Sequence, residues 1–351
     1  SATFFKDQMV YSSACDSFSV IKTIYDWNNQ PYLDLYITKP GLAPGSKDDK
    51  SAFKMVNSRY HEGPVCFSSD YNTMYFTRNN YFNGHVTTMP DGTNNLKIFS
   101  SQFDGKRWGR ISEFPLNSNR YSVGHPALSP DNKTMYFISD MPGGFGQTDI
   151  YKTELINGVW SKPVNLGETI NTSGKEMFPY VDRNGILYFA SNGHPGNGGL
   201  DIYAAEQIHA TDYKVINLGA PLNSTYDDFG LVFDPDSLSG YFTSNRPGGK
   251  GDDDNYSFRV NKIELRVHAL ENVTKKMLAG TKVSLMNSKG KVEDFKVADK
   301  NGIATFSVGA GQKYQVLAEN SSYNPEEIQA KIKGSLFNYV QDEDVFMKQS
   351  L

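Results

Sequence analysis

Eight polar side chains, scattered along the sequence, are the strongest candidates for a functional site. They are His61, Glu62, Arg78, His125, Glu176, Asp227, Asp228 and Arg246. Side chains of these types can line a ligand site, and in some proteins they supply an acid and a base from different parts of the fold. Because they are far apart along the chain, only the tertiary structure could bring them together.

No local motif for catalysis accompanies these residues. The chain has no G-x-S-x-G elbow, no H-E-x-x-H helix, no phosphate-binding P-loop and no paired-cysteine zinc spacing. Its six histidines are scattered and form no metal-binding pattern. We therefore predict a protein that is not an enzyme and that uses neither a cofactor nor a metal ion.

Glycine-rich loops raise two further possibilities, phosphate binding and calcium binding. The loops PGGFGQTDIYK (142–152) and PGNGGLDIYAA (195–205) lead into strands, whereas a phosphate loop should open a helix. Calcium could use Asp149, Asp201 and the run Asp252–Asp254 as oxygen ligands. The alternative is a hairpin in which the aspartate binds nearby backbone amides, and the recurrence of the loop favours this alternative.

An internal repeat predicts the fold of most of the chain. An apolar strand ending in an aromatic pair recurs five times, with its second aromatic at Tyr11, Phe76, Phe137, Phe189 and Phe242. Asp-led turns precede the last four copies, and the glycine-rich loops and further short strands follow. Four short strands per repeat are typical of a propeller blade, because a single blade leaves its faces and edges in water until neighbours cover them. We predict an all-β propeller of five or six blades, in which the stretch 37–58 could complete the sixth.

The pattern changes near Val260, which predicts a second domain. Alternating strands follow at 263–270, 281–287, 302–308 and 313–319, as in a small antiparallel sandwich. We therefore divide the chain into a propeller at 1–260 and a sandwich at 261–351. A formal net charge of −4 and the absence of a long basic run argue against nucleic acid, and no apolar run is long enough for a membrane helix. The sequence leaves open whether Cys15 and Cys66 pair.

In a propeller, the first strand of each blade lies nearest the axis, and six of the eight candidate residues immediately precede or begin such strands. Arg78 and Arg246 follow the second strands. Two interpretations remain open. The side chains could converge on one mouth of the central channel as a binding funnel, or they could tie neighbouring blades together. Trp108 and Trp160 recur at equivalent positions, which favours packing between blades over ligand stacking.

Particular strings resemble known families. HPALSPDNKTMYFISD and GGFGQTDIY resemble the PD40 repeats of TolB-like β-propellers. The segments at 10–36, 61–79 and 178–203 are similar to the propeller of OmpA-family lipoproteins of Bacteroidota. Residues 262–308 are similar to a carboxypeptidase-regulatory-like sandwich, a transthyretin-like fold. This domain order resembles the central part of PorE-like lipoproteins of the type IX secretion system, and the resemblance covers essentially the whole chain.

The resemblance implies a function as a non-enzymatic scaffold in the periplasm, associated with the outer membrane. It implies contacts with other secretion components, with PorP-type outer-membrane proteins and PorK/PorN as candidates. Peptidoglycan binding in such lipoproteins belongs to an OmpA-like domain that these 351 residues do not contain. We expect no membrane insertion of this part of the chain. The alternative is a ligand-sensing propeller that binds a peptide, glycan or muropeptide in its central funnel.

Overall fold

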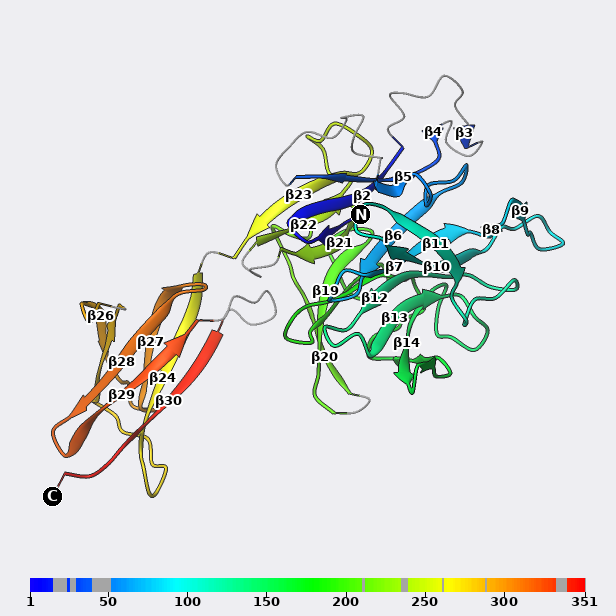
Figure 1. The fold of residues 1–351 in the computed structure, drawn as a ribbon. Helices are drawn as coiled ribbons and strands as arrows, with labels where there is room; N and C mark the ends of the chain where they lie inside the picture. Colours follow the sequence, from blue (N-terminus) through cyan, green and yellow to red (C-terminus); the bar gives the residue numbers. More distant parts are fainter. Residues whose placement is uncertain are drawn as a thin grey trace. The chain divides into compact units, whose positions relative to one another are not determined.

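The fold is seen in a computed structural model, and it contains two compact units (Figure 1). The structure describes residues 1–14, 24–25, 30–39, 52–209, 212–234, 239–260, 262–287, 289–332 and 340–350. The units span Ser1–Phe258 and Arg259–Leu351, so the division falls close to the change in sequence pattern near Val260. Within the described ranges, the regular structure consists of strands, and no helix is long and apolar enough to cross a membrane.

The first unit contains five antiparallel sheets, which we call blades 1 to 5. Blade 1 is β1 (Ala2–Phe5), β2 (Gln8–Ser13) and β5 (Asp34–Thr38), and blade 2 is β6 (Glu62–Phe67), β7 (Thr73–Asn79), β10 (Leu96–Phe103) and β11 (Trp108–Glu113). Blade 3 is β12 (Val123–Leu128), β13 (Thr134–Ser139), β14 (Asp149–Ile156), β15 (Val159–Trp160) and β16 (Val164–Asn165). Blade 4 is β17 (Glu176–Val181), β18 (Leu187–Ser191), β19 (Asp201–Gln207) and β20 (Tyr213–Asn217), and blade 5 is β21 (Asp228–Phe233), β22 (Ser239–Ser244) and β23 (Asp254–Arg259). Two short hairpins are added, β3 (Ile24–Tyr25) with β4 (Gln30–Pro31) and β8 (Tyr81–Phe82) with β9 (His85–Val86).

The blades close into a ring through their first strands. These strands contact one another in the cyclic order β1, β6, β12, β17, β21 and back to β1. The described residues therefore form a five-bladed β-propeller, which confirms the propeller prediction. The opening residues supply β1, the innermost strand of blade 1, and part of the stretch 37–58 that could have formed another blade lies outside the described residues.

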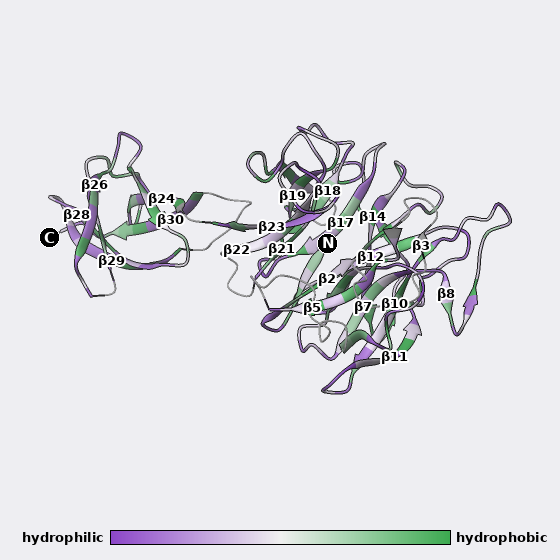
Figure 2. Ribbon diagram, turned by 90° about the horizontal axis from the view of Figure 1, so that it is seen from above, coloured by the Kyte–Doolittle hydropathy of each residue, from purple (hydrophilic) through white to green (hydrophobic). Residues whose placement is uncertain are grey.

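Aromatic side chains fill the space between blades. Trp108 is fully buried, with its ring 5.4 Å from Phe5 of blade 1 and 5.0 Å from Phe103 of its own blade. Trp160 of blade 3 meets Tyr75 of blade 2 edge to face. Both tryptophans thus belong to the packing between blades, as predicted. Hydrophobic residues concentrate in the strands and polar residues in the loops, as Figure 2 shows.

The second unit is a sandwich of two sheets. One sheet has the order β27 (Ile303–Gly309), β24 (Lys262–Glu271) and β30 (Val340–Met347). The other has the order β26 (Val292–Val297), β25 (Lys282–Met286), β28 (Lys313–Asn320) and β29 (Tyr323–Lys331). On β24, alternate residues such as Leu265 and Val267 are buried, because successive side chains of a strand point to opposite faces. On β25, the consecutive residues Val283, Ser284 and Leu285 are all buried. β30 pairs in parallel with β24, and the other strand pairs are antiparallel.

Candidate functional site: blade clasps and an axial pocket

An asparagine anchors the loop between consecutive blades in four places, and it is buried at Asn171 and Asn223 and half-buried at Asn57 and Asn117. The Asn171 side chain accepts a hydrogen bond from the backbone N–H of Ile150 at 2.7 Å and donates one to its carbonyl at 3.0 Å. Asn223 binds Ile202 in the same way. The pattern also appears at Asn57 with Leu35 and at Asn117 with Ile98. The loop that follows a blade is thus attached, through its asparagine, to the third strand of the same blade.

A carboxylate then fixes the same loop to the start of the next blade. Glu62, Glu176 and Asp228 are the first residues of β6, β17 and β21, and all three are fully buried. Each accepts a hydrogen bond from a backbone N–H four residues earlier, as from Thr172 to Glu176 at 2.9 Å. We call each asparagine, with the carboxylate that follows it, an inter-blade clasp; the pairs are Asn57 with Glu62, Asn171 with Glu176, and Asn223 with Asp228.

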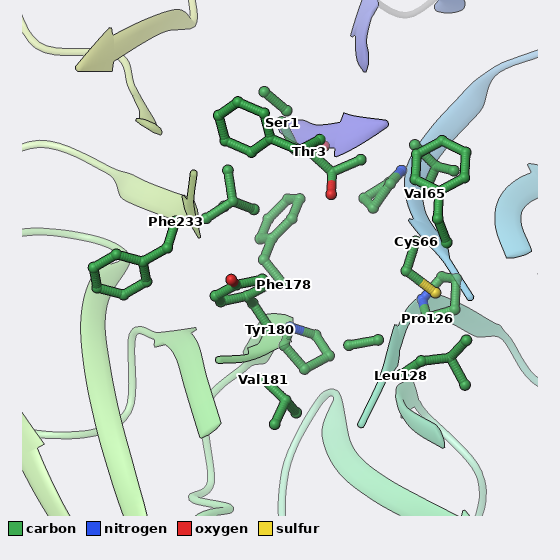
Figure 3. A pocket seen from close by; sticks show the side chains of 18 of the residues that line it. Ser1, Thr3, Val65, Cys66, Pro126, Leu128, Phe178, Tyr180, Val181 and Phe233 are labelled. Carbon is green, nitrogen blue, oxygen red and sulfur yellow. The ribbon is translucent and has the colours of Figure 1, made fainter. Parts of the chain in front are cut away.

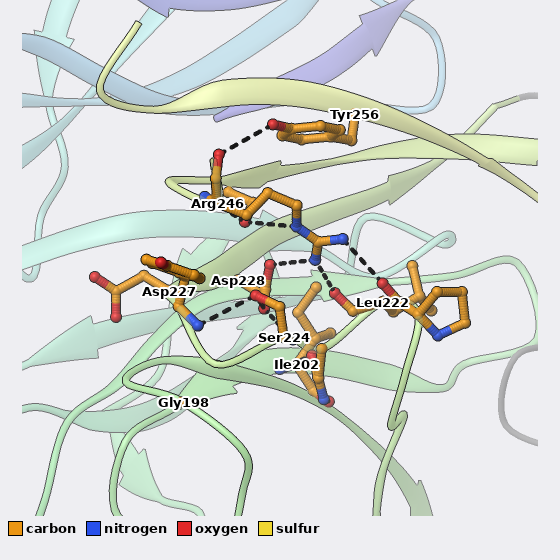
Figure 4. Close-up of polar contacts among 12 residues, drawn as sticks. Gly198, Ile202, Leu222, Ser224, Asp227, Asp228, Arg246 and Tyr256 are labelled. Carbon is orange, nitrogen blue, oxygen red and sulfur yellow. Dashed lines mark hydrogen bonds and ion pairs between the residues drawn. The ribbon is translucent and has the colours of Figure 1, made fainter. Parts of the chain in front are cut away.

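A donor from the second strand region of the blade completes two of the clasps with positive charge. Arg78 Nε lies 2.8 Å from Glu62 Oε1, and a second guanidinium nitrogen donates to the carbonyl of Val56. Arg246 binds Asp228 at 2.5 Å and donates to the carbonyl of Leu222 at 2.6 Å, as Figure 4 shows. Each arginine therefore joins the clasp carboxylate to the residue just before the clasp asparagine.

Blade 4 makes the equivalent contacts without an arginine. The Ser191 hydroxyl donates to Glu176 Oε1 at 2.7 Å, and His194 Nε2 lies 2.9 Å from the carbonyl of Ile170. Blade 3 begins its first strand with Val123 and blade 1 with Ala2, so neither has the carboxylate of blades 2, 4 and 5. A clasp is therefore present at three of the five blades, and an arginine completes two of these three clasps.

Burial dominates the electrostatics of the Glu62–Arg78 pair. Loss of hydration raises the pKa of Glu62 to about 7, against the opposing effects of Arg78 and Ser58. Burial likewise lowers the pKa of Arg78. A buried ion pair of this kind contributes stability only while both partners are present, because either one alone would be an uncompensated charge.

The remaining two candidates outside the pocket also have structural contacts. His61 Nδ1 accepts from the N–H of Leu33 at 3.1 Å, its ring lies 4.6 Å from the ring of Tyr32 at a tilt of 54°, and burial lowers the pKa of the imidazole. Asp227 accepts a hydrogen bond from the N–H of Leu200 at 2.8 Å and another from the side chain of Asn245. Both residues hold loops at the same end of the blades as the clasps.

The eight predicted residues therefore divide unevenly between the two interpretations. Glu62, Arg78, Glu176, Asp228 and Arg246 are drawn into the clasps, which is the geometry of ties between blades. His125 lies apart from them, in the central pocket described below. The structure does not gather the eight side chains at one open mouth, because the buried carboxylates satisfy loop amides within the ring.

Sequence reasoning missed the clasp asparagines, although a hydrophobic residue followed by Asn and Ser or Thr recurs at 56–58, 116–118, 170–172 and 222–224.

The aspartates of the glycine-rich loops bind their own loops. Asp149 accepts backbone N–H groups of Phe145 at 2.6 Å and Gly146 at 3.0 Å. Asp201 and Asp254 accept equivalent pairs of amides. This is the hairpin alternative to calcium binding, and no group of metal-binding side chains is found in the described part of the chain.

An axial pocket of about 420 Å³ lies among the innermost strands of all five blades. Figure 3 shows Val65, Leu128, Val181 and Phe233 on its walls and Phe178 projecting toward its centre. Its lining continues into the turns that follow these strands, at Ser68, Ser69, Tyr71, Ser129, Pro130, Asn132, Arg183 and Asp234. The pocket therefore extends toward the hairpin turns, at the opposite end of the first strands from the clasps.

His125 and Phe178 form one end of this pocket. Both precede a proline, which disfavours the right-handed helical conformation, and both have a left-handed backbone with φ of 49° and 52°. Their rings stack 4.3 Å apart, and Phe178 stacks in turn on Phe229 at 4.6 Å. His125 Nδ1 accepts from the N–H of Phe178 at 3.3 Å, and burial lowers the pKa of His125 to about 3. This end of the pocket is therefore aromatic and electrically neutral near pH 7.

Non-glycine residues with positive φ are uncommon, and such strain often accompanies a binding or catalytic site. The thiol of Cys66 also lines the pocket, where burial raises its pKa to about 12. Cys66 is a free thiol in the structure, and Cys15 lies outside the described residues. A neutral imidazole and a protonated thiol suit the binding of an uncharged group better than acid–base or nucleophilic chemistry.

The topology places the first unit in the class of five-bladed β-propellers. No known family profile and no curated protein matches the chain. Among solved structures, it is similar to an exo-β-1,3-galactanase from Clostridium thermocellum, with 14% identity, a TM-score of 0.43, and coverage of 95% of this chain and 82% of that one. It is also similar to an endo-arabinase from Bacteroides thetaiotaomicron, with 11% identity, a TM-score of 0.42, and coverage of 74% and 92%. At these values the likenesses carry no argument about activity, and the fold assignment rests on the strand topology.

Proposed function

We propose that this chain is a non-enzymatic adaptor of the bacterial envelope, acting in the periplasm as part of a type IX secretion assembly. The observation that carries the proposal is that most of the polar candidate residues form contacts within the ring and do not line a binding site. The buried carboxylates and arginines stabilise the ring through the clasps, which leaves a rigid body with loops and a neutral pocket for binding. The resemblance of the sequence to PorE-like lipoproteins supplies the class of assembly.

In this function, the propeller would present its loops to protein partners, and the sandwich would separate it from domains elsewhere in such lipoproteins. PorP-type outer-membrane proteins and PorK/PorN are the candidate partners. Contact with peptidoglycan would pass through an OmpA-like domain that is not among these residues. A rigid ring suits this task because clasped blades keep their loops in fixed relative positions.

The test is an affinity pull-down of the tagged chain from detergent-solubilised envelopes of a Bacteroidota species, read by mass spectrometry. Reproducible recovery of secretion components above a tag-only control would support the adaptor function. Failure to recover any of them, together with turnover of an ester, peptide or glycosidic substrate, would contradict it. Clasp variants are unsuitable for this experiment, since Glu62→Ala or Glu176→Ala would weaken the ring itself.

The axial pocket supports a second candidate, a ligand-sensing function. The pocket is of the size that holds small ligands, and its aromatic end combines apolar surface with strained backbone. A peptide, glycan or muropeptide would bind there without being transformed. Binding that survives in the absence of any secretion partner would favour this function over the adaptor.

A further inference from the structure

The innermost strand of each blade is a sheet edge that faces the axial pocket. Each pairs with a neighbour on one side only, so alternate N–H groups point away from the blade. Ser129 and Asp182 donate their N–H groups within their own blades, to Thr134 and Ile186. The preceding residues, Leu128 and Val181, therefore direct their N–H groups away from their blades, toward the pocket that both residues line.

Side chains from the preceding blade cover two of these edge N–H groups. The Cys66 sulfur of blade 2 receives a hydrogen bond from the backbone of Leu128 in blade 3. The Tyr180 phenol of blade 4 receives one from the backbone of Phe233 in blade 5. Cys66 and Tyr180 hold equivalent positions, because each pairs with the tyrosine at the same place in its second strand.

Blade 3 has Ala127 at this position, paired with Tyr136. Its methyl group has no hydrogen-bonding atom for the N–H of Val181 in blade 4. The strand edge of blade 4 is thus left with a donor directed to the pocket, beside the apolar side chains of Leu128 and Val181.

The surroundings of this donor restrict what it would bind. The end of the pocket formed by His125 and Phe178 is aromatic, whereas the charged residues Arg183 and Asp234 line its turn end. A charged side chain placed against Phe178 would lose much of its hydration, and His125 would not offset that loss because it is neutral near pH 7. A sugar would require several converging polar side chains, and the carboxylates and arginines of the clasps do not line the pocket, which leaves Arg183 and Asp234 as the charged side chains of its lining.

We propose that the axial pocket binds an extended peptide segment of a partner, with an uncharged apolar side chain against Phe178 and a peptide carbonyl accepting the N–H of Val181. A peptide supplies both requirements in adjacent atoms, an acceptor on the backbone and an apolar group on the side chain. This inference rests on the adaptor function and gives it a specific contact.

The experiment is a titration of the full chain, isotopically labelled, followed by amide NMR spectra. The probe is N-acetyl-Gly-Phe-Gly-amide. Two comparison peptides carry Lys or Glu in place of Phe, and a third comparison probe is the N-acetylglucosamine disaccharide. We expect the Phe peptide to shift the amide resonances of Val181 and Phe178, and the charged peptides to bind at least about tenfold more weakly.

Two variants make the test specific. Ala127→Tyr copies the residue that blade 4 already carries at this position, so the fold tolerates it, and its phenol would cover the Val181 N–H. We expect Ala127→Tyr to weaken peptide binding by about tenfold or more, and Ile156→Tyr, on an exposed strand end, to leave binding unchanged. Equal binding by both variants would overturn the proposal, as would shifts confined to residues outside the pocket, no shifts at about 10 mM probe, or stronger binding of the disaccharide.

Failure of the inference is distinguishable from failure of the adaptor function. If wild type and Ala127→Tyr recover the same secretion components from solubilised envelopes, the adaptor stands and the pocket contact is wrong. If the peptide binds as described but no component is recovered, the pocket is a peptide site and the adaptor function is wrong.

Discussion

The buried imidazole of His125 should make the stability of the propeller depend on pH in a specific window. Burial lowers the pKa of His125 from 6.5 to about 3. Between these values the unfolded chain binds a proton at this histidine and the folded chain does not. The free energy of unfolding must therefore rise with pH across this window and fall as the solution is acidified from about pH 6.5.

The magnitude follows from the two pKa values. Protonation of His125 in the unfolded chain lowers the free energy of unfolding at pH 5 by about 2 kcal/mol relative to pH 7, because His125 of the folded chain is still neutral at pH 5. The contribution continues to grow until the pH approaches 3. Other titrating groups add their own pH dependence, so the effect must be read as a difference between proteins.

The assay is urea unfolding at pH 7 and pH 5, followed by tryptophan fluorescence. The three tryptophans, Trp27, Trp108 and Trp160, precede residue 259 in the sequence, and the two described ones, Trp108 and Trp160, lie in the packing between blades, so the signal reports the propeller. The test variant is His125→Asn, since asparagine tolerates a left-handed backbone and does not titrate. The matched control is His85→Asn, on the exposed strand β9.

We expect the loss of stability between pH 7 and pH 5 to be smaller in His125→Asn than in wild type by about 2 kcal/mol. The His85→Asn protein should lose as much as wild type. If acidification destabilises His125→Asn and wild type equally, His125 is not buried in neutral form, and the argument for an uncharged pocket end is wrong.

Three further predictions use the same fluorescence assay. Glu62→Ala should lower the free energy of unfolding by about 3–5 kcal/mol, because Arg78 is left as a buried unpaired charge, and Glu62→Ala with Arg78→Met should recover much of the loss. Arg107→Ala, which breaks an exposed pair with Asp104, should have no measurable effect. Asn171→Ala should cost about 1–3 kcal/mol by leaving the backbone of β14 without its clasp partner, and an unchanged unfolding curve would show that this clasp contributes nothing. At Phe178, the Gly variant should be more stable than the Ala variant by about 1 kcal/mol, because φ is 52° there, and the reverse order would contradict the strained backbone.

The contrast between the repeat and the candidate residues shows what kinds of information a sequence carries. The aromatic pairs ending at Phe76, Phe137, Phe189 and Phe242 predict the second strand of blades 2 to 5, because strand periodicity and turn residues act locally. The structure shows in addition that the opening residues form β1, the first strand of blade 1. Tryptophans at equivalent positions predict packing between blades for the same reason.

The candidate residues were identified by type, but their roles depended on distances that the sequence does not contain. Glu62 and Arg78 are 16 residues apart and 2.8 Å apart in space, because the first hairpin of the blade brings them together. Asn171 and Asn223 looked like ordinary loop residues until their bonds to the third strand were seen. His125 differed from the other seven only through the ring closure that places it on the axis.

The sequence by itself determined the all-β class, the repeat and the change of pattern near Val260, since these depend on residues close together in the chain. The tertiary structure decided that the ring closes with five blades in the described residues, that the carboxylates are buried in clasps, and that the pocket has a neutral aromatic end. The physical reason is that burial and pairing are properties of neighbours in space. In a propeller these neighbours are brought together by closure of the ring, which no local pattern specifies.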